Sequence, residues 1–173
     1  MLRWLLPPDV SDPGDLPEFA QTVAALKAGR LVGVPTETVY GLAADASNPA
    51  ACAAIFAAKG RPHFNPLIAH VENLEAAQRH AVFDARALAL ANAFWPGALT
   101  LVLPKRADSP VCDLATAGLD SIALRVPAAP VMRALARSVG APLAAPSANR
   151  SGRISGTTAD AVADDLGPAL AVL

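Results

Sequence analysis

The sequence has little of what defines several large classes of protein. It contains two cysteines in 173 residues, Cys52 and Cys112, with no Cys-x-x-Cys spacing. This argues against a disulfide scaffold or a zinc ribbon and fits a reducing compartment. No run approaches the roughly 18 apolar residues of a membrane span, and the apolar start of the chain is too short for a secretory signal. We therefore expect a cytoplasmic protein with no membrane partner.

An excess of charge of either sign is also missing. Lys and Arg number 14 against 15 Asp and Glu, which gives a net charge of −1. No global basic field therefore attracts nucleic acid or an anionic membrane, and any anion binding must come from a local cluster. At 53% hydrophobic and 17% charged residues, the composition is that of a folded chain, and its length suggests one domain.

Several catalytic motifs do not occur. The sequence has no Gly-x-x-x-x-Gly-Lys-Ser/Thr loop, no Gly-x-Gly-x-x-Gly fingerprint and no Gly-x-Ser-x-Gly elbow. It also lacks a pair of acidic residues of the kind found in glycosidases or two-metal sites. His63 and His70 have no third ligand at a suitable spacing, so no protein-held metal is expected. The remaining polar clusters suit the positioning of anions better than nucleophilic attack by the protein.

Apolar segments alternate between strand and helix patterns, which predicts an α/β fold. Residues 1–15 form a lead-in segment, and a single domain spans 1–173. Helices are predicted at about 16–28, 49–58, 73–79, 84–94, 130–139 and 157–166, the last opened by a capping box of Thr157 and Asp160. Strands are predicted at 31–34, 67–71, 99–103, 121–126, 143–145 and 169–173.

The segment Pro35-Thr-Glu-Thr-Val-Tyr-Gly-Leu42 follows the first predicted strand and changes character abruptly. Two hydroxyls, a carboxylate and a phenol come within five residues. In open α/β sheets, ligands bind where strands end and present polar groups. An ordinary polar turn explains the same pattern, so the segment alone leaves both interpretations open.

Two cations, Lys59 and Arg61, flank Gly60 just after a predicted helix. Cations at this position stabilise the helix dipole, which is one sufficient explanation. A fixed turn at Gly60 also aims a point charge and a planar guanidinium at one place, and together they suit a phosphate or carboxylate.

The later polar residues allow similar alternatives. Ser121 and Arg125 share one face of a predicted strand, with Ile122, Leu124 and Val126 on the other, so Arg125 is either at the sheet surface or paired in a site. The loop Pro146-Ser-Ala-Asn149 has the hydroxyl and amide groups of an anion-binding nest or of a common turn. His70 is either structural or a ligand-binding residue.

Together these segments resemble the YrdC-like family, the threonylcarbamoyl-AMP synthases. The resemblance rests on motifs in the family's order and spacing from about residue 16 to 170. These are Pro35–Leu42, Lys59-Gly-Arg-Pro62, Asn65-Pro-Leu67 with His70, Phe94-Trp-Pro-Gly97, Leu99-Thr-Leu101, Ser121–Pro127, Pro146–Asn149 and Ser151-Gly152. The family's signature of Lys, Arg, Ser and Asn is present as Lys59, Arg61, Ser147 and Asn149.

The resemblance implies a twisted open mixed sheet with a basic concave cavity. It also implies a nucleotidyltransferase that forms threonylcarbamoyl-AMP and pyrophosphate from L-threonine, bicarbonate and ATP, with Mg²⁺ on the phosphates. The product would feed a transferase complex that modifies the adenine beside a tRNA anticodon. Lys59 and Arg61 would be catalytic, and ATP would bind at these two and at Asn65, Ser121, Ser147, Asn149 and Ser155. Threonine would bind at Thr38, His70, Arg125 and Ala145.

The sequence departs from the family at two places. Position 145 is often Thr in the family and is Ala here, and the sequence stops at Leu173, before a family strand and an ATP-contacting Arg. We therefore expect that the C-terminal end of the domain is missing, so that either the sequence is a piece of a longer protein or the site is incomplete and activity is weakened. Two other functions stay open, a non-catalytic module that binds double-stranded RNA or ribosomes and a carbamoyl-adenylate domain of a carbamoyltransferase.

Overall fold

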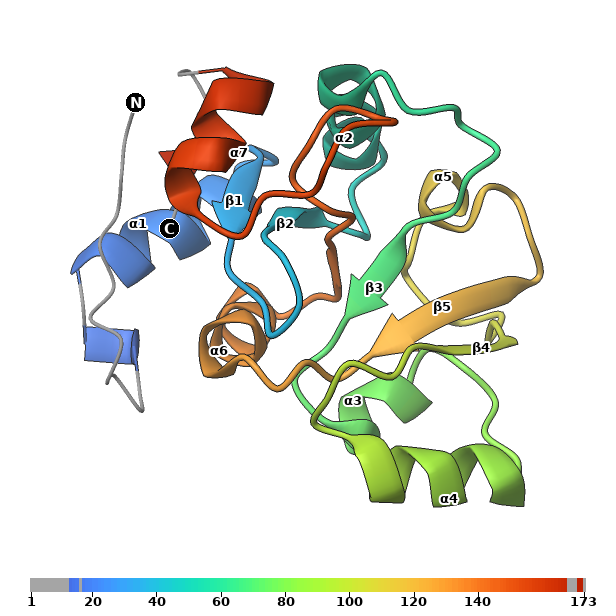
Figure 1. Ribbon diagram of the computed structural model, residues 1–173. Coiled ribbons are helices and arrows are strands. Elements are labelled where there is room, and N and C mark those ends of the chain that lie inside the picture. The colour runs from blue at the N-terminus through green and yellow to red at the C-terminus, as the bar shows by residue number, and fades with distance from the viewer. Residues whose placement is uncertain (1–12, 16, 168–170, 173) are drawn as a thin grey trace.

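A seven-stranded sheet with helices packed against it forms the molecule (Figure 1). The computed structural model describes residues 13–15, 17–167 and 171–172. Its helices are η1 (Pro13–Asp15), α1 (Pro17–Lys27), α2 (Pro49–Lys59), α3 (Leu74–Gln78), α4 (Ala85–Phe94), α5 (Asp113–Thr116), α6 (Pro130–Val139) and α7 (Ala159–Leu166). Its strands are β1 (Val32–Val34), β2 (Gly41–Asp45), β3 (Ile68–His70), β4 (Leu101–Pro104), β5 (Ser121–Arg125), β6 (Leu143–Ala144) and β7 (Ala171–Val172). None of the helices in the described ranges has the length and apolarity to cross a membrane.

The strand order is β4-β5-β3-β6-β2-β1-β7. The pairs β3–β5 and β1–β7 are parallel, whereas β1–β2, β2–β6, β3–β6 and β4–β5 are antiparallel. The mixed open α/β sheet predicted from the sequence is therefore confirmed.

Helix boundaries lie where the local chemistry places them. Asn48 caps α2 because its side-chain oxygen accepts hydrogen bonds from the backbone N–H groups of Ala50 and Ala51, at 3.0 and 3.2 Å. The same helix ends at Gly60, whose φ of 58° is in the left-handed region that favours glycine. Pro130 at the start and Gly140 after the end bound α6 at its predicted residues.

Three elements, η1, β2 and α5, were absent from the sequence prediction, and several predicted boundaries differ from the observed ones by one or two residues. Strand β2 consists mostly of small residues, because both its faces are buried. It therefore lacks the β-branched residues by which strands are usually recognised in a sequence. Helix α5 has four residues and lies inside a predicted loop. The cap of α7 is Thr158 rather than Thr157, since the Thr158 hydroxyl accepts from the Ala161 N–H at 3.2 Å.

The two predicted terminal segments lie partly outside the described residues. Of the lead-in, 13–15 form a 3₁₀ turn and 1–12 are outside the description. Of the tail strand, Ala171–Val172 pairs with β1, while 169, 170 and 173 are outside.

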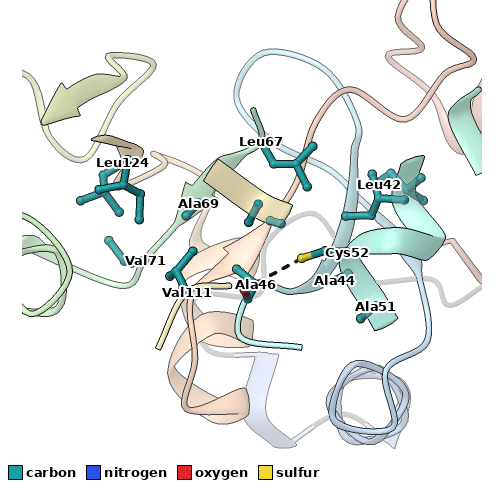
Figure 2. Packing of buried hydrophobic residues seen from close by; sticks show 14 of the residues in the cluster. Leu42, Ala44, Ala46, Ala51, Cys52, Leu67, Ala69, Val71, Val111 and Leu124 are labelled. Carbon is teal, nitrogen blue, oxygen red and sulfur yellow. Dashed lines mark hydrogen bonds between the residues drawn. The ribbon is translucent and has the colours of Figure 1, made fainter. Parts of the chain in front are cut away.

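A large apolar cluster packs on one face of the sheet (Figure 2). Leu42 of β2, Leu124 of β5 and Ile55 and Phe56 of α2 all belong to this cluster and are at most 1% exposed. Cys52 lies in this cluster with its thiol 3.9 Å from the carbonyl oxygen of Ala46 (Figure 2). This face is filled along most of the sheet.

A second apolar cluster covers only part of the opposite face. Leu26 of α1 and Leu135 of α6 pack there on Val32 of β1 and Leu143 of β6. The two helices pack against each other, and α1 lies beside β1 and β2, whereas α6 also contacts β3 (Figure 1). This cluster contains no residue of β3, β4 or β5. On this face, these three strands therefore lie outside the described apolar clusters.

The strand register determines which side chains the open half presents. Ile68 pairs with Ala123 and His70 with Arg125, and paired residues point to the same face. Along β5, Ser121, Ala123 and Arg125 are half-buried, whereas Ile122 and Leu124 are buried in the first cluster. The alternation predicted for this strand is confirmed, and it places Arg125 beside His70.

Candidate active site

A small cavity of about 130 Å³ lies where the β1–β2 loop meets β3, β5 and the residues after β6. Four of the residues predicted to bind threonine line it, together with the predicted nucleotide residue Ser147. The complete lining is Thr36, Thr38, Val39, Tyr40, Gly41, Ile68, His70, Arg125, Ala145, Pro146 and Ser147. Since one water occupies about 30 Å³, the volume corresponds to roughly four waters, enough for a small amino acid but not for a nucleotide.

His70 brings an uncharged ring with an unused polar atom to this cavity. Burial, followed by the nearby charge of Arg125, lowers the pKa of His70 to about 4. The imidazole is therefore neutral at neutral pH. Its Nδ1 atom is buried and has no hydrogen-bond partner among the described residues. A buried unpaired ring nitrogen is costly unless a ligand completes it.

Arg125 supplies the positive charge of the cavity. Its Nε donates a hydrogen bond to the Thr100 hydroxyl at 2.9 Å, and its Nη1 lies 3.7 Å from Oε1 of Glu37. The side chain is 14% exposed. Of the two alternatives that the sequence left open for Arg125, the structure supports the one in which the residue is paired within a site.

The Thr38 hydroxyl is held by its own loop. Thr36 Oγ1 lies 3.1 Å from Thr38 Oγ1, accepts from the Thr38 backbone N–H at 3.2 Å and donates to the Val39 carbonyl. This local turn of hydroxyl-to-backbone bonds fixes the segment after Pro35. The polar residues that follow the first predicted strand therefore form a turn and also line a cavity.

The side chain of Lys59, the last residue of α2, points away from its own helix and toward the loop after β6. Its ammonium group donates to the backbone carbonyls of Ser147 and Asn149, and its own carbonyl accepts from the Ser151 N–H at 2.8 Å. Lys59 is 2% exposed. Burial and then the charge of Arg61 lower its pKa to about 8. The lysine thus fixes the 147–151 loop beside the end of α2. From the sequence alone, stabilisation of the helix dipole was a sufficient reason for a lysine at this position.

Arg61 is also turned toward backbone carbonyls. Its Nε donates to the Asn65 carbonyl at 3.2 Å and its Nη2 to the Pro66 carbonyl at 3.0 Å, and burial lowers its pKa. A guanidinium has five N–H groups, so three stay available for another partner. The two predicted residues Arg61 and Asn65 are brought together in one turn.

The predicted residues Asn149 and Ser155 belong to a loop that is tied to the small cavity. The Asn149 amide donates to the carbonyls of Arg150 and Arg153, both at 2.8 Å, and its Oδ1 is buried without a partner among the described residues. Ser155 is half-buried and adjoins Gly156, whose carbonyl accepts from the Tyr40 N–H at 2.9 Å. Because Tyr40 lines the cavity, the loop is hydrogen-bonded to one residue of the cavity wall.

Ser121 lies apart from the other predicted residues. It shares the open face with Arg125 but is four positions away along β5, roughly 13 Å at about 3.3 Å per residue, and it does not line the cavity. A group that contacts both residues must extend along the strand.

A larger hollow of about 760 Å³ lies elsewhere, between α3, the end of α6 and the 106–110 segment. None of the predicted site residues lines it. Its charged lining consists of internal pairs, Arg79–Glu75, Arg106–Asp108 and Arg137–Glu72. We therefore place the candidate site at the smaller cavity, where unpaired polar atoms remain.

The sequence did not identify Thr36 and Thr100 as site residues, and it assigned no role to Glu37. Thr36 acts within the motif that the sequence singled out, so its position was a usable signal. Thr100 and Glu37 reach Arg125 from 25 and 88 positions away in the chain, and no local pattern reports such pairs.

Comparisons with known proteins agree with this geometry. The family model Sua5_yciO_yrdC, described as "Telomere recombination", matches residues 24–173. The chain is 44% identical over 172 residues to the threonylcarbamoyl-AMP synthase of Bacillus subtilis, covering 98% of this chain and 49% of that protein. It is 48% identical over 143 residues to the enzyme of the same name from Pyrococcus abyssi, covering 81% of this chain and 41% of that protein.

The fold of the chain is also similar to that of a solved structure. The crystal structure of P. abyssi Sua5 complexed with L-threonine superimposes with a TM-score of 0.87 at 39% identity. The match covers 99% of this chain and 48% of the other. The chain thus spans about half the length of the relatives that it matches.

Proposed function

Because the chain belongs to the Sua5/YciO/YrdC family, we propose that it carries the catalytic site of a threonylcarbamoyl-AMP synthase. L-threonine binds in the cavity of about 130 Å³, and ATP lies outside it along the open face of β5. The observation that carries the proposal is the composition of this cavity, in which a cation, a neutral imidazole with a free nitrogen and a threonine hydroxyl converge.

The amino acid is held by complementary charge and hydrogen bonds. The guanidinium of Arg125 pairs with the threonine carboxylate, for which its planar fork is suited. His70 and the Thr38 hydroxyl hydrogen-bond the remaining polar groups of the substrate. Because His70 is neutral, its free nitrogen can accept from or donate to the ligand without adding charge. The amine of threonine is thus left beside the open face.

The reaction joins three substrates in two steps. The amine and bicarbonate give a carbamate with loss of water. A carbamate oxygen then attacks the α-phosphorus of ATP, the bond to the β-phosphate oxygen breaks, and pyrophosphate leaves. Catalysis of such a transfer is mainly alignment and charge neutralisation. Lys59 and Arg61 supply positive charge at the phosphates, and Ser147, Asn149, Ser155, Asn65 and Ser121 supply hydrogen bonds along the nucleotide.

Mg²⁺ on the phosphates fits this arrangement without protein ligands. In the described part of the chain, no group of three or more His, Cys, Asp or Glu side chains is placed to hold a metal ion. A magnesium ion carried by the nucleotide would add charge neutralisation at the phosphates to that of Lys59 and Arg61. The product passes to a tRNA-modifying transferase complex in a cytoplasmic pathway.

The test is pyrophosphate release from ATP, measured with threonine, bicarbonate and Mg²⁺ omitted in turn. Release that requires all of them supports the synthase. Threonine binding by calorimetry is measured in parallel, because the cavity should hold threonine even if the chain turns over slowly. Arg137→Ala serves as a control. Arg137 is exposed, its Nε lies 2.8 Å from Oε2 of Glu72, and neither residue lines the cavity.

Other outcomes would reject the proposal. Salt-sensitive binding of double-stranded RNA without turnover or threonine binding would indicate the RNA-binding module. Release that depends on carbamoyl phosphate would indicate the carbamoyl-adenylate domain of a carbamoyltransferase.

A further inference from the structure

One carboxylate beside the cavity has no part in the reaction described above. Glu37 belongs to the β1–β2 loop, and its side chain is 18% exposed. It is not among the residues that line the cavity. Its oxygens lie near two groups, Nη1 of Arg125 at 3.7 Å and the backbone N–H of Ala129 at 3.4 Å. Arg125 is thus the member of the cavity that Glu37 touches.

The distance between Glu37 and Arg125 indicates how the pair works. At 3.7 Å, the contact is longer than the 2.7–3.2 Å of an N–H···O hydrogen bond. The attraction is electrostatic, and it leaves the N–H groups at Nη1 free to bond another acceptor. A carboxylate ligand can therefore use them while Glu37 still attracts the guanidinium.

Thr100 fixes the other side of the same guanidinium. Its hydroxyl accepts from Nε of Arg125 at 2.9 Å. Because the guanidinium is rigid and planar, one hydrogen bond at Nε and one attraction at Nη1 restrict both its position and its plane. The terminal N–H groups of Arg125 are then available to a ligand in the cavity.

Glu37 is itself held at the start of a helix. Ala129 is the N-cap of α6, and its side chain makes no capping hydrogen bond. The carboxylate of Glu37 lies at this positive end of the helix, where a negative charge is stabilised. The β1–β2 loop, β5 and α6 therefore meet at one carboxylate, which keeps Glu37 in place when a ligand enters.

We propose that Glu37 and Thr100 are positioning residues that orient Arg125 for the carboxylate of the amino-acid substrate. The ligand part of this inference rests on the proposed function, whereas the orientation of Arg125 does not. Glu37 and Thr100 act on the recognition of the substrate carboxylate. They therefore affect the affinity and KM for threonine and leave kcat nearly unchanged.

The first experiment needs no ligand. The ¹H–¹⁵N signal of Arg125 Nε is identified by its loss in Arg125→Lys. The guanidinium is held in the native protein, so we expect a sharp, slowly exchanging signal. Glu37→Gln and Thr100→Val should broaden it or speed its hydrogen exchange, and Thr100→Ser should keep it. An unchanged signal in Glu37→Gln and Thr100→Val overturns the proposal, whatever the enzyme binds.

The second experiment measures binding of L-threonine and of L-threonine amide, which lacks the carboxylate. Glu37→Gln and Thr100→Val should each weaken threonine binding about five- to tenfold and change amide binding less than twofold, with kcat within twofold. Thr100→Ser should bind like the native protein. Glu72→Gln is the matched control, because this carboxylate pairs with exposed Arg137.

Equal losses for threonine and its amide would show a general structural defect and overturn the positioning role. Thermal unfolding of each variant checks that the fold is retained. If the native protein binds no threonine while the Arg125 signal responds as expected, the proposed function fails and the positioning of Arg125 stands.

Discussion

The two halves of the candidate site differ in how their polar groups are used. In the small cavity, the Nδ1 of His70 has no hydrogen-bond partner among the residues that the structure describes, and not every N–H group of Arg125 has one there. In the predicted phosphate half, Lys59 and Arg61 already bond backbone carbonyls of nearby loops. The proposed amino-acid half thus keeps polar atoms available for a ligand, whereas the cations of the proposed phosphate half shape the loops around them.

This difference suggests that the same substitution of a cation has different results in the two halves. Loss of a cation in the amino-acid half should reduce affinity for one substrate. Loss of a cation in the phosphate half should disturb a loop as well as charge, so activity and stability should fall together.

The largest effect is expected for Lys59→Ala. We expect pyrophosphate release to fall about 10²–10³-fold, because a charge near the transferred phosphate is lost. Two buried carbonyls also lose their partner, at about 1–3 kcal/mol for an unsatisfied buried group. Activity assays and thermal unfolding measure the two losses. Arg79→Ala is the control, as Arg79 is a solvent-exposed cation. A Lys59→Ala protein of native stability would contradict the loop-shaping role.

Arg125→Ala should give the next largest effect. In this variant we expect the affinity for one substrate to fall, rather than activity and stability together. We expect the Kd for threonine to rise about 30- to 100-fold, since loss of a partly buried ion-pair partner is typically worth 2 kcal/mol or more. ATP binding should change little. Calorimetry with each substrate separates the two affinities. An equal loss of ATP affinity would remove the distinction between the two halves.

The pH dependence should also separate the halves. The pKa of Lys59 is about 8, so its charge is lost as pH rises through 8, and kcat/KM should fall up to about tenfold by pH 9. The pKa of His70 is about 4, so threonine affinity should have no step from His70 between pH 5 and 8. Pyrophosphate release and calorimetry over pH 5–9 test both expectations, and an alkaline step in threonine affinity alone would contradict them.

The same lysine predicts a stability trend of opposite sign. Its pKa in the folded protein lies below the ordinary 10.5, so the unfolded chain binds the proton more tightly. Stability should therefore rise between pH 8 and 10.5 and be lower below 8, by on the order of 1–3 kcal/mol. The free energy of unfolding of the native protein, compared with Lys59→Met across this range, measures the contribution. A native curve parallel to that of the variant would argue against a buried charged Lys59.

A smaller effect is expected for Gly41→Ala. An added Cβ would lie 3.1 Å from Cβ of Ala145, so the cavity wall must shift by a few tenths of an ångström. We expect threonine affinity to fall about three- to fivefold and ATP affinity to stay unchanged. Ala50→Ser is the control, because Ala50 is an exposed residue of α2 that does not line the cavity. Unchanged threonine binding in Gly41→Ala would place the ligand elsewhere.

The fold was largely predictable because most of its signals are local. The alternation along β5 and the Pro130 and Gly140 boundaries of α6 could be read directly from neighbouring residues. Strand β2 could not, because its alanines reflect burial on both faces, which arises only when the sheet and helices assemble.

The sequence motifs named residues that the fold brings together, but they did not reveal the geometry of these residues. The motifs named Thr38, His70 and Arg125, and the structure brings these three around one cavity. That Lys59 bonds the carbonyls of Ser147 and Asn149 was not readable, because the partners are 88 and 90 positions away.

The loop from Ser147 to Gly156 is fastened to both halves of the site. Lys59 holds one part of it, while the Ala148 N–H donates to the Tyr40 carbonyl at 2.7 Å and Gly156 accepts from the Tyr40 N–H. A nucleotide that steadies this loop would also steady the wall around the amino acid. Each substrate should then bind more tightly when the other is present, by the same factor in both directions. Calorimetric titration of threonine with and without a non-hydrolysable ATP analogue, and the reverse titration, would measure that mutual reinforcement. Independent affinities would show that the loop transmits nothing between its two ends.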